Sequence, residues 1–421
     1  MKTQTRYDVP AALEKTGREQ GECRKAGENI VLFGLFGCGN FGNDGSLEAM
    51  IDFLRQARPK AKLSCVCADP DLIAREFAVE AYPIRGSRGR GRSGWLAFMK
   101  IPARLFEAAR AFRYIRGAEL MIVPGTGILD DYGERFYGVP FDIFRWCLAA
   151  RITGAKIAFV SIGAGPIRHG LSRLLMISAA RLAHYRSYRD LLSKEFMESA
   201  GFDTRRDAIF PDIAFKLRKP TTPIHRRNTR LTVGVGVMNY SGWYGFAAGG
   251  EGIFDCYIGK LADFVVHLLD SGHDVRLLTG EGSDCKAVAA LLAKVGEARP
   301  DAGDGRIAAE PAHSLHDLMH QMSRSDVVVA TRYHNLVCAL KMGKPTISLG
   351  YSKKNDALMQ QMGLSDYCQH VERFEVETLA RQFSHLVALR KDHEREIRDK
   401  MRLFEEQLAR QDAHLLSAFL S

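Results

Sequence analysis

No run of apolar residues in this 421-residue chain approaches the roughly 20 that a membrane-spanning helix requires. The first 28 residues are polar and charged, without the hydrophobic segment of a signal peptide. The nine cysteines are odd in number and irregularly spaced, which argues against a disulfide framework and indicates reduced thiols. Together these absences predict a cytoplasmic protein.

Two common catalytic motifs are also missing. The chain has no G-x-S-x-G nucleophile elbow and no Walker phosphate loop. The sequence therefore argues against an α/β-hydrolase and against a P-loop ATPase.

Acidic residues are scarce in one segment. Between Arg85 and Arg116 lie nine Lys and Arg but only one acid, Glu107, so this segment carries most of the net charge of +10. No nucleic-acid-binding motif accompanies it, and nucleic acid is not expected as a partner. A phosphate-bearing ligand or the anionic inner face of a membrane fits the charge. A solvated Gly/Arg loop leading into an amphipathic helix is the alternative.

The length exceeds what one hydrophobic core usually covers, so two domains are expected. Short apolar runs alternate with helical patterns, which predicts two doubly wound, Rossmann-like α/β domains that face a cleft. The predicted strands are 29–36, 61–67, 118–124, 155–163, 231–237, 273–280, 325–331 and 345–350. The predicted organisation is a polar tail (1–28), a first domain (29–218), a linker (219–230), a second domain (231–372) and C-terminal helices (373–421).

A glycine-rich loop follows the first predicted strand. Gly37, Gly39 and Gly42 form G-x-G-x-x-G, which alone would indicate a dinucleotide site and an NAD-dependent oxidoreductase. The polar Asn40 and Asp44 stand where such a site prefers small apolar residues. The loop could instead present backbone N–H groups and polar side chains to a sugar or a phosphate.

Two further strand ends carry polar residues. PGTGILDDYG (124–133) contains Gly125, where backbone could approach a ligand, and Asp130 and Asp131, either of which could project into the cleft to deprotonate a sugar hydroxyl. Helix capping is the structural alternative for these carboxylates. Arg189 follows a later strand and could grip a carboxylate or phosphate, or could simply neutralise its neighbour Asp190.

The most informative segment is SDVVVATRYHNLVCALKMGKPTISLGYSKK (325–354). Arg332 and His334 lie between a buried strand and a helix, where they suit an anion. Lys354 lies at the next strand end. A buried structural role for His334 is the alternative. The histidines at 313, 316 and 320 have helical spacing but lack a completing ligand pattern, so no metal is predicted.

The ordered set GCGNFGND, GTGILDD, SIGAGPI, SYRDLLSKEF, PDIAF and TRYHNLVCALKMGKPTISLGYSKK resembles the polysaccharide pyruvyl transferase family over about residues 29–365. The resemblance implies a fold like the two-domain GT-B glycosyltransferases. It also implies transfer of an enolpyruvate unit from phosphoenolpyruvate to two hydroxyls of a sugar, as a cyclic ketal. By motif it assigns Arg332, His334 and Asp131 to catalysis and Arg189 and Lys354 to substrate binding.

The expected partners are therefore phosphoenolpyruvate and a sugar or lipid-linked oligosaccharide of a cell-surface polysaccharide, with peripheral association at an anionic membrane. Phosphoenolpyruvate is the donor substrate, and no cofactor or metal is expected. Besides the NAD-dependent oxidoreductase, a GT-B glycosyltransferase using a nucleotide sugar and a non-catalytic sugar or phosphate binder stay open, because a fold alone does not decide function.

Overall fold

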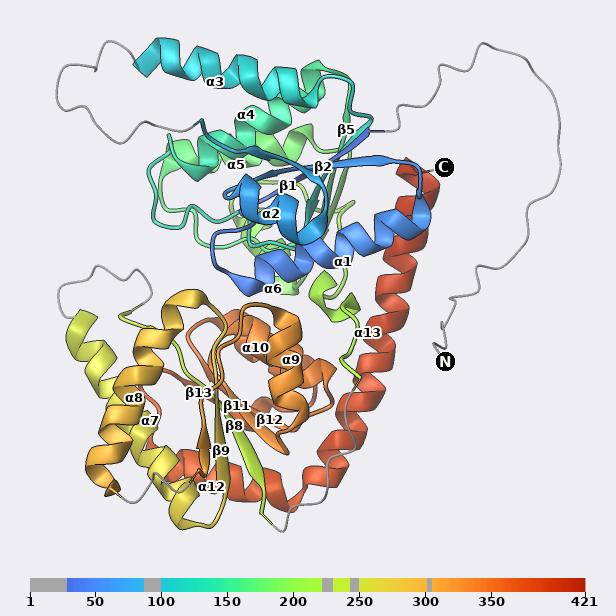
Figure 1. Cartoon of the computed structure of the whole chain (residues 1–421). Coiled ribbons are helices and arrows are strands. Elements are labelled where there is room, and N and C mark those ends of the chain that lie inside the picture. The colour runs from blue at the N-terminus through green and yellow to red at the C-terminus, as the bar shows by residue number, and fades with distance from the viewer. Residues whose placement is uncertain (1–28, 87–99, 222–229, 243–249, 301–304, 421) are drawn as a thin grey trace, which may run out of the picture.

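The computed structural model describes residues 29–86, 100–221, 230–242, 250–300 and 305–420. The predicted tail, most of the predicted linker and residues 87–99 of the basic segment lie outside these ranges. Two α/β lobes are stacked, and one long helix runs along both of them (Figure 1). No helix among the described residues is long and apolar enough to cross a membrane.

The first lobe is built on a seven-stranded sheet in the order β3-β2-β1-β4-β5-β6-β7, with every pair parallel. Its strands are β1 (Asn29–Phe33), β2 (Lys62–Cys67), β3 (Glu80–Pro83), β4 (Leu120–Pro124), β5 (Lys156–Ile162), β6 (Tyr185–Tyr188) and β7 (Ala208–Ile209). Its helices are α1 (Phe41–Ala57), α2 (Pro70–Phe77), α3 (Lys100–Ile115), α4 (Val139–Ile152), α5 (Gly170–Leu182) and α6 (Leu191–Ser199). A 3₁₀ turn, η2 (Ile213–Lys216), leads out of this lobe.

The second lobe repeats the design with a six-stranded parallel sheet in the order β10-β9-β8-β11-β12-β13. Its strands are β8 (Thr232–Gly236), β9 (Asp274–Leu278), β10 (Ile307–Ala308), β11 (Val327–Ala330), β12 (Thr346–Gly350) and β13 (Cys368–His370). Its helices are α7 (Gly250–Asp270), α8 (Cys285–Ala298), α9 (Leu315–Ser323), α10 (Tyr333–Lys341) and α11 (Lys353–Gln361), with short turns at η3 (Gly282–Asp284) and η5 (Ser365–Tyr367). The sequence prediction of two doubly wound sheets is confirmed.

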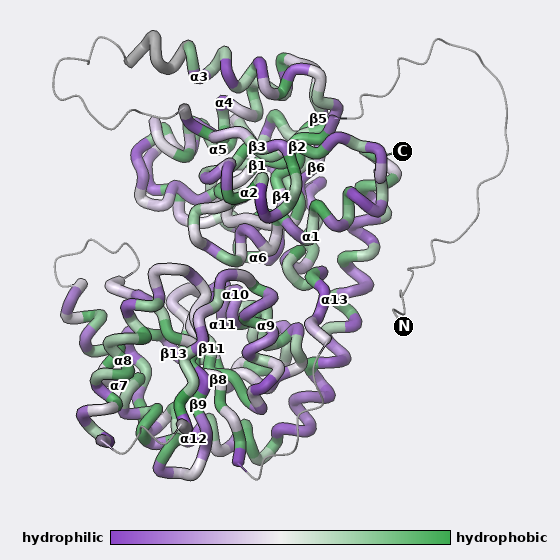
Figure 2. The backbone as a smooth tube through the Cα atoms, viewed as in Figure 1, coloured by the Kyte–Doolittle hydropathy of each residue, from purple (hydrophilic) through white to green (hydrophobic). Residues whose placement is uncertain are grey.

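The central strands are apolar because both faces of each sheet are covered by helices. The four residues Val327 to Ala330 of β11 are fully buried, as are Leu120 to Val123 of β4. Figure 2 shows the same distribution, with hydrophobic residues concentrated in the sheets and hydrophilic residues on the outer helix faces. This continuous burial explains why these strands could be predicted from short apolar runs.

The chain ends in two helices, α12 (Val376–Ala388) and α13 (Arg390–Phe419), and α13 returns from the second lobe to the first (Figure 1). The predicted apolar face of this tail is confirmed. It consists of Ile397, Met401, Phe404 and Leu408, which are all buried. Near its end, the side chain of Gln411 donates to Ser161 and Ser187 of the first lobe at 3.0 and 2.8 Å. The helix therefore ties the two lobes together.

Candidate active site

Arg332 stands at the end of β11 and directly precedes α10. Its Nε and Nη2 donate to the two carboxylate oxygens of Asp284 at 2.8 and 2.6 Å, and its Nη1 lies 2.8 Å from Oε2 of Glu281. Although burial by itself lowers the pKa of Arg332, the two carboxylates raise it above the usual value. The guanidinium is therefore charged and held in one orientation.

Asp284 is the fixed part of this arrangement. It is completely buried and accepts hydrogen bonds from the backbone N–H groups of Asn239, Gly280 and Glu281 at 3.0 to 3.1 Å. A carboxylate held by three backbone donors cannot turn away. It therefore fixes the position of the Arg332 side chain in the second lobe.

His334 lies in the first turn of α10 and faces the other lobe. A Cβ atom built on Gly42 of α1 would lie 1.9 Å from its Nδ1, so the ring packs directly against that glycine. Its Nε2 lies 3.8 Å from Oδ2 of Asp212, which is beyond hydrogen-bonding distance. Within the described part of the chain, this buried Nε2 has no hydrogen-bond partner.

Asp212 connects His334 to Arg189. Its Oδ2 accepts from Nη1 of Arg189 at 3.0 Å, and its Oδ1 accepts from the backbone N–H of Ala214 at 2.9 Å. Burial alone would raise the pKa of Asp212, but His334 and Arg189 hold it below its usual value. A buried carboxylate is thus placed between an arginine and an imidazole.

Arg189 follows β6 and is held on several sides. Besides its bond to Asp212, its guanidinium lies 4.4 Å from the centre of the Tyr333 ring, and its Nε lies 3.6 Å from Oδ2 of Asp190. Its side chain is only 8% exposed. The neighbour Asp190 therefore contributes to the surroundings of Arg189, but Asp212 makes the shorter contact.

Lys354 lies in the first turn of α11, after β12. Burial, and next the charge of Arg189, lowers its pKa to about 8. Asp130 and Asp190 act in the opposite direction. Among the described residues its ammonium group makes no hydrogen bond or salt bridge. A cation that is destabilised in the free protein gains from the arrival of an anion.

The first glycine-rich loop uses its polar side chains to hold itself together. Oδ1 of Asn40 accepts from the N–H groups of Gly42 and Asn43 and caps α1, while Oδ1 of Asp44 accepts from Gly37 at 2.8 Å. Burial raises the pKa of Asp44 to about 6. Asn40 and Asp44, both expected to bind substrate, are therefore used in building the loop.

Gly39 of the same loop reaches the second lobe. Its φ of +87° suits glycine, and its carbonyl accepts from the N–H of Gly282 at 3.4 Å. Asn40 also forms an isolated backbone bridge with Glu281. The loop thus contacts the second lobe next to Arg332.

The loop after β4 places its two aspartates differently. Asp131 is completely buried, and its two oxygens accept from the backbone N–H groups of Gly133 and Arg168 at 3.0 and 2.6 Å. Its expected projection into the cleft is therefore wrong. Asp130 is the partly exposed neighbour that lies within electrostatic reach of Lys354, and burial raises its pKa. The left-handed Gly125 packs against Ile213 and Ser46.

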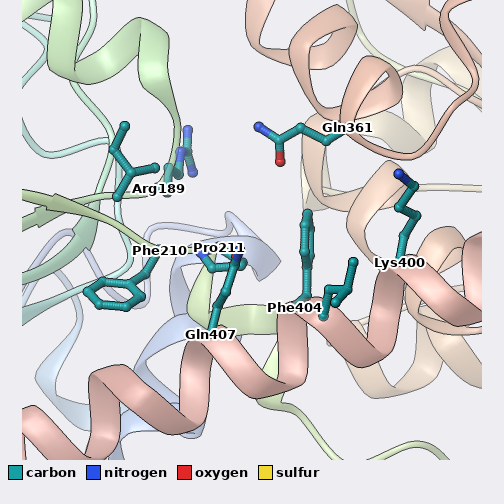
Figure 3. A pocket seen from close by; sticks show the side chains of 9 residues that line it. Arg189, Phe210, Pro211, Gln361, Lys400, Phe404 and Gln407 are labelled. Atoms are coloured by element: carbon teal, nitrogen blue, oxygen red, sulfur yellow. The ribbon is translucent and has the colours of Figure 1, made fainter.

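A cavity of about 380 Å³ opens between the lobes beside α13. Figure 3 shows Arg189 on one side and Gln361 and Lys400 on the other, with the ring of Phe404 between them. A smaller adjoining cavity shares Arg189 and Phe404 and is lined by Asp212, Tyr333 and Lys354. Arg189, Lys354 and Asp212 therefore border one interlobe space.

The family model for polysaccharide pyruvyl transferase matches residues 40–353, most of the chain. The chain belongs to the polysaccharide pyruvyl transferase family. No curated protein sequence matches it.

Solved structures resemble this family member in fold. UDP-GlcNAc 2-epimerase from Neisseria meningitidis, solved with bound UDP-GlcNAc, has a TM-score of 0.56 at 12% identity and covers 91% of this chain and 99% of its own. A glycosyltransferase from Rickettsia africae ESF-5 has a TM-score of 0.55 at 9% identity, with 93% and 99% covered. These likenesses establish a GT-B-like fold of two Rossmann-like domains.

The dinucleotide interpretation of the first loop loses its basis in this pyruvyl transferase. The space beside Gly42 is filled by His334 of the other lobe. Asp69, which ends the strand after the loop, accepts from the N–H of Leu72 and caps α2. The loop is thus a contact between the lobes.

Of the three clustered histidines, His316 contacts the first lobe. Nε2 of His316 lies 2.8 Å from Oε1 of Glu48 in α1, another contact between the lobes. The hydrogen bond that His316 donates to Glu48 raises the pKa of His316. The described ranges contain no group of three or more His, Cys, Asp or Glu side chains placed to hold a metal ion.

Sequence reasoning missed three acids of this family member. Asp212 lies in PDIAF, a segment recognised as part of the family pattern but given no role. Glu281 and Asp284 directly follow the predicted strand 273–280, at the strand ends where the cleft was expected. Attention to acids at the predicted strand ends would have singled out Glu281 and Asp284, though not the residues they contact, whereas Asp212 follows no predicted strand.

Proposed function

We propose that this protein forms a cyclic pyruvate ketal on a sugar of a cell-surface polysaccharide precursor, with phosphoenolpyruvate as donor. The observation that carries the proposal is the meeting of Arg189 and Lys354 with the His334–Asp212 pair, contributed by both lobes. Phosphoenolpyruvate carries up to three negative charges, and arginine and lysine are the side chains that bind phosphate and carboxylate groups.

In this scheme His334 is the acid. Its Nε2 protonates the methylene carbon of the donor, and C2 becomes an electrophilic, oxocarbenium-like centre. Asp212 stabilises the imidazolium before transfer, and Arg189 keeps Asp212 ionised. The cations hold the negative charge of the donor throughout, and the scheme needs no cofactor.

The acceptor then attacks C2. We assign the base to Asp130, because its pKa is raised by burial and it lies near Lys354. It takes the proton of the first sugar hydroxyl as the new C–O bond forms. The C2–O bond to phosphate then breaks, and its electron pair leaves with the phosphate. A second hydroxyl of the same sugar forms the second C2–O bond and gives its proton to the now neutral His334, a closure favoured by the fixed position of the sugar.

Tyr132 is a candidate platform for the acceptor sugar. It follows the aspartates, is 45% exposed, and its hydroxyl donates to the carbonyl of Gly127 at 2.7 Å. Its φ of +49° is unusual for a residue other than glycine, and such strain concentrates at functional sites. A fixed aromatic ring with an open face suits the apolar side of a sugar.

The experiment is an incubation with phosphoenolpyruvate and a panel of 4-nitrophenyl glycosides and lipid-linked oligosaccharides. Phosphate release and a product whose mass gains one pyruvate less water support the proposal. Replacing His334 by Ala should reduce turnover by about 10²- to 10⁴-fold with little change in donor affinity. If no member of the panel gives phosphate release, the proposal fails.

We further propose a cytoplasmic location with peripheral binding to an anionic membrane. In the basic segment, Arg85 pairs with Asp142 and Arg110 pairs with Glu107, whereas Arg113 on α3 and Arg116 just after it are exposed. Phe106, on the same helix, is 69% exposed. Sedimentation with vesicles containing phosphatidylglycerol at low salt tests this; a protein that stays in the supernatant contradicts it.

A further inference from the structure

The side chain of Glu281 occupies one side of Arg332. Its Oε2 lies 2.8 Å from Nη1, while Asp284 takes Nε and Nη2. One guanidinium thus faces two carboxylates, so the local charge of the three groups is negative. A donor with two or three negative charges would be repelled by this cluster as it stands.

The two carboxylates differ in how firmly they are held. Asp284 is fully buried and accepts three backbone hydrogen bonds in addition to the two from Arg332. The side chain of Glu281 is 31% exposed. Besides its contact with Arg332, it accepts from the Ser283 hydroxyl at 3.2 Å and from one backbone N–H, that of Asp284, in a capping box. Asp284 is an anchor, whereas Glu281 can be displaced at low cost.

Glu281 also stands where the lobes meet. Its backbone forms a bridge with Asn40, and the next residue, Gly282, donates to Gly39 of the first lobe. Tyr351, which lies within electrostatic reach of Glu281, is also within reach of Arg332 and Arg189. Glu281 is therefore located at the contact between the lobes, and its carboxylate lies beside Arg332.

We infer that Glu281 is a placeholder for an anionic group of the donor. In the free protein its carboxylate pairs with Nη1 of Arg332. When the donor arrives, its carboxylate or phosphate replaces Glu281 on that nitrogen, while Asp284 keeps the guanidinium in position. This inference rests on the proposed function, because it takes phosphoenolpyruvate as the anion that competes with Glu281.

The test is the dissociation constant of phosphoenolpyruvate, measured by calorimetry without acceptor. Glu281→Gln and Glu281→Ala should both bind the donor about two- to tenfold more tightly than the wild type, because a partly exposed ion pair no longer has to be broken. A residue that merely supports the site would give weaker binding when replaced. Unchanged or weaker binding in these variants overturns the inference.

Glu310→Gln is the matched control. Glu310 also pairs with arginines, at 2.7 Å from Arg276 and in contact with Arg324, and its side chain is 42% exposed. Because it is in the same lobe but outside the site, its replacement should leave donor affinity unchanged. A similar gain in this control would show that the gain reflects overall charge, and it would contradict the inference.

A double variant tests whether the effect passes through Arg332. In an Arg332→Gln background, the further change Glu281→Gln should give no gain in affinity. A gain in affinity of the same size as in the wild-type background would show that Glu281 acts independently of Arg332, and it would overturn the inference. Failure of the wild type to bind phosphoenolpyruvate would instead overturn the proposed function, and this inference with it.

Discussion

Gly42 of the first lobe packs so closely against His334 of the second that a single added Cβ atom would lie 1.9 Å from Nδ1 of the imidazole. No rotamer of a larger residue avoids this contact, because Cβ is fixed by the backbone. The proposed acid is therefore positioned by the opposite lobe as well as by its own helix. Catalysis in this account needs both lobes in contact.

Gly42→Ala should reduce turnover by about 10²-fold or more, because a displacement of about 1 Å at the reacting centre costs that much. The measurement is kcat for phosphate release, together with thermal unfolding to confirm the fold. Gly259→Ala in α7 is the control, since a Cβ atom there meets nothing within 4 Å. Full activity of Gly42→Ala would show that the interlobe contact does not position His334.

Substitution of one of the adjacent aspartates should reduce stability, and substitution of the other should reduce activity. Asp131→Asn leaves one of two backbone N–H groups without an acceptor and should lower the free energy of unfolding by about 1 to 3 kcal/mol. Asp130→Asn keeps an acceptor for Tyr132 but cannot serve as a base, so its turnover should fall about 10²-fold with little loss of stability. The measurements are denaturant unfolding and kcat of both variants. A loss of turnover in Asp131→Asn together with a loss of stability in Asp130→Asn would assign the base to Asp131 instead.

Donor binding should weaken at high pH because of Lys354. Its pKa is lowered to about 8, so the free protein loses this positive charge as the pH rises above that value. The affinity for phosphoenolpyruvate should therefore fall about tenfold between pH 7 and pH 10. Lys354→Gln should bind phosphoenolpyruvate less tightly at pH 7, and its affinity should not change near pH 8. Lys354→Arg should bind phosphoenolpyruvate well at both pH 7 and pH 10. A wild-type affinity that is flat over this range would contradict the role of Lys354.

The ionised carboxylate of Asp44 should lower the free energy of unfolding at neutral pH. Its pKa in the folded protein is about 6, above the usual 3.8, so the folded state binds the proton more tightly than the unfolded state. Stability therefore falls as the pH rises from about 4 to 6, and the penalty is complete above that window. Asp44→Asn keeps an oxygen for Gly37 and should stabilise the protein by about 2 kcal/mol at pH 7.5 but hardly at pH 4. Denaturant unfolding at both values tests this, and destabilisation at pH 7.5 would contradict it.

The central strands β4 and β11 could be predicted from sequence because both faces are buried and their residues are apolar throughout. The edge strands could not. β3 and β13 are short, and every residue in them is at least partly exposed, so Glu80 in the one and Gln369 in the other interrupt any apolar pattern. Their strand pairing comes from the neighbouring strand rather than from their own composition.

The cations of the site could be predicted because they follow buried strands in a recognisable order. Their acidic partners could not, because Asp212 and Asp284 lie far along the chain from the groups they hold and become partners only in the fold. Asp130 and Asp131 show a further limit. They are adjacent and chemically identical, and only the course of the loop decides which one is buried and which one is partly exposed.

The central claim is that the cations between the lobes recognise phosphoenolpyruvate. The most direct measurement is a binding titration of the wild type with phosphoenolpyruvate and with UDP-GlcNAc, the ligand of the similar epimerase structure, repeated with Arg189→Gln. We expect saturable binding of phosphoenolpyruvate that UDP-GlcNAc does not displace and that Arg189→Gln loses. Binding of UDP-GlcNAc without binding of phosphoenolpyruvate would contradict it and favour a nucleotide-sugar enzyme.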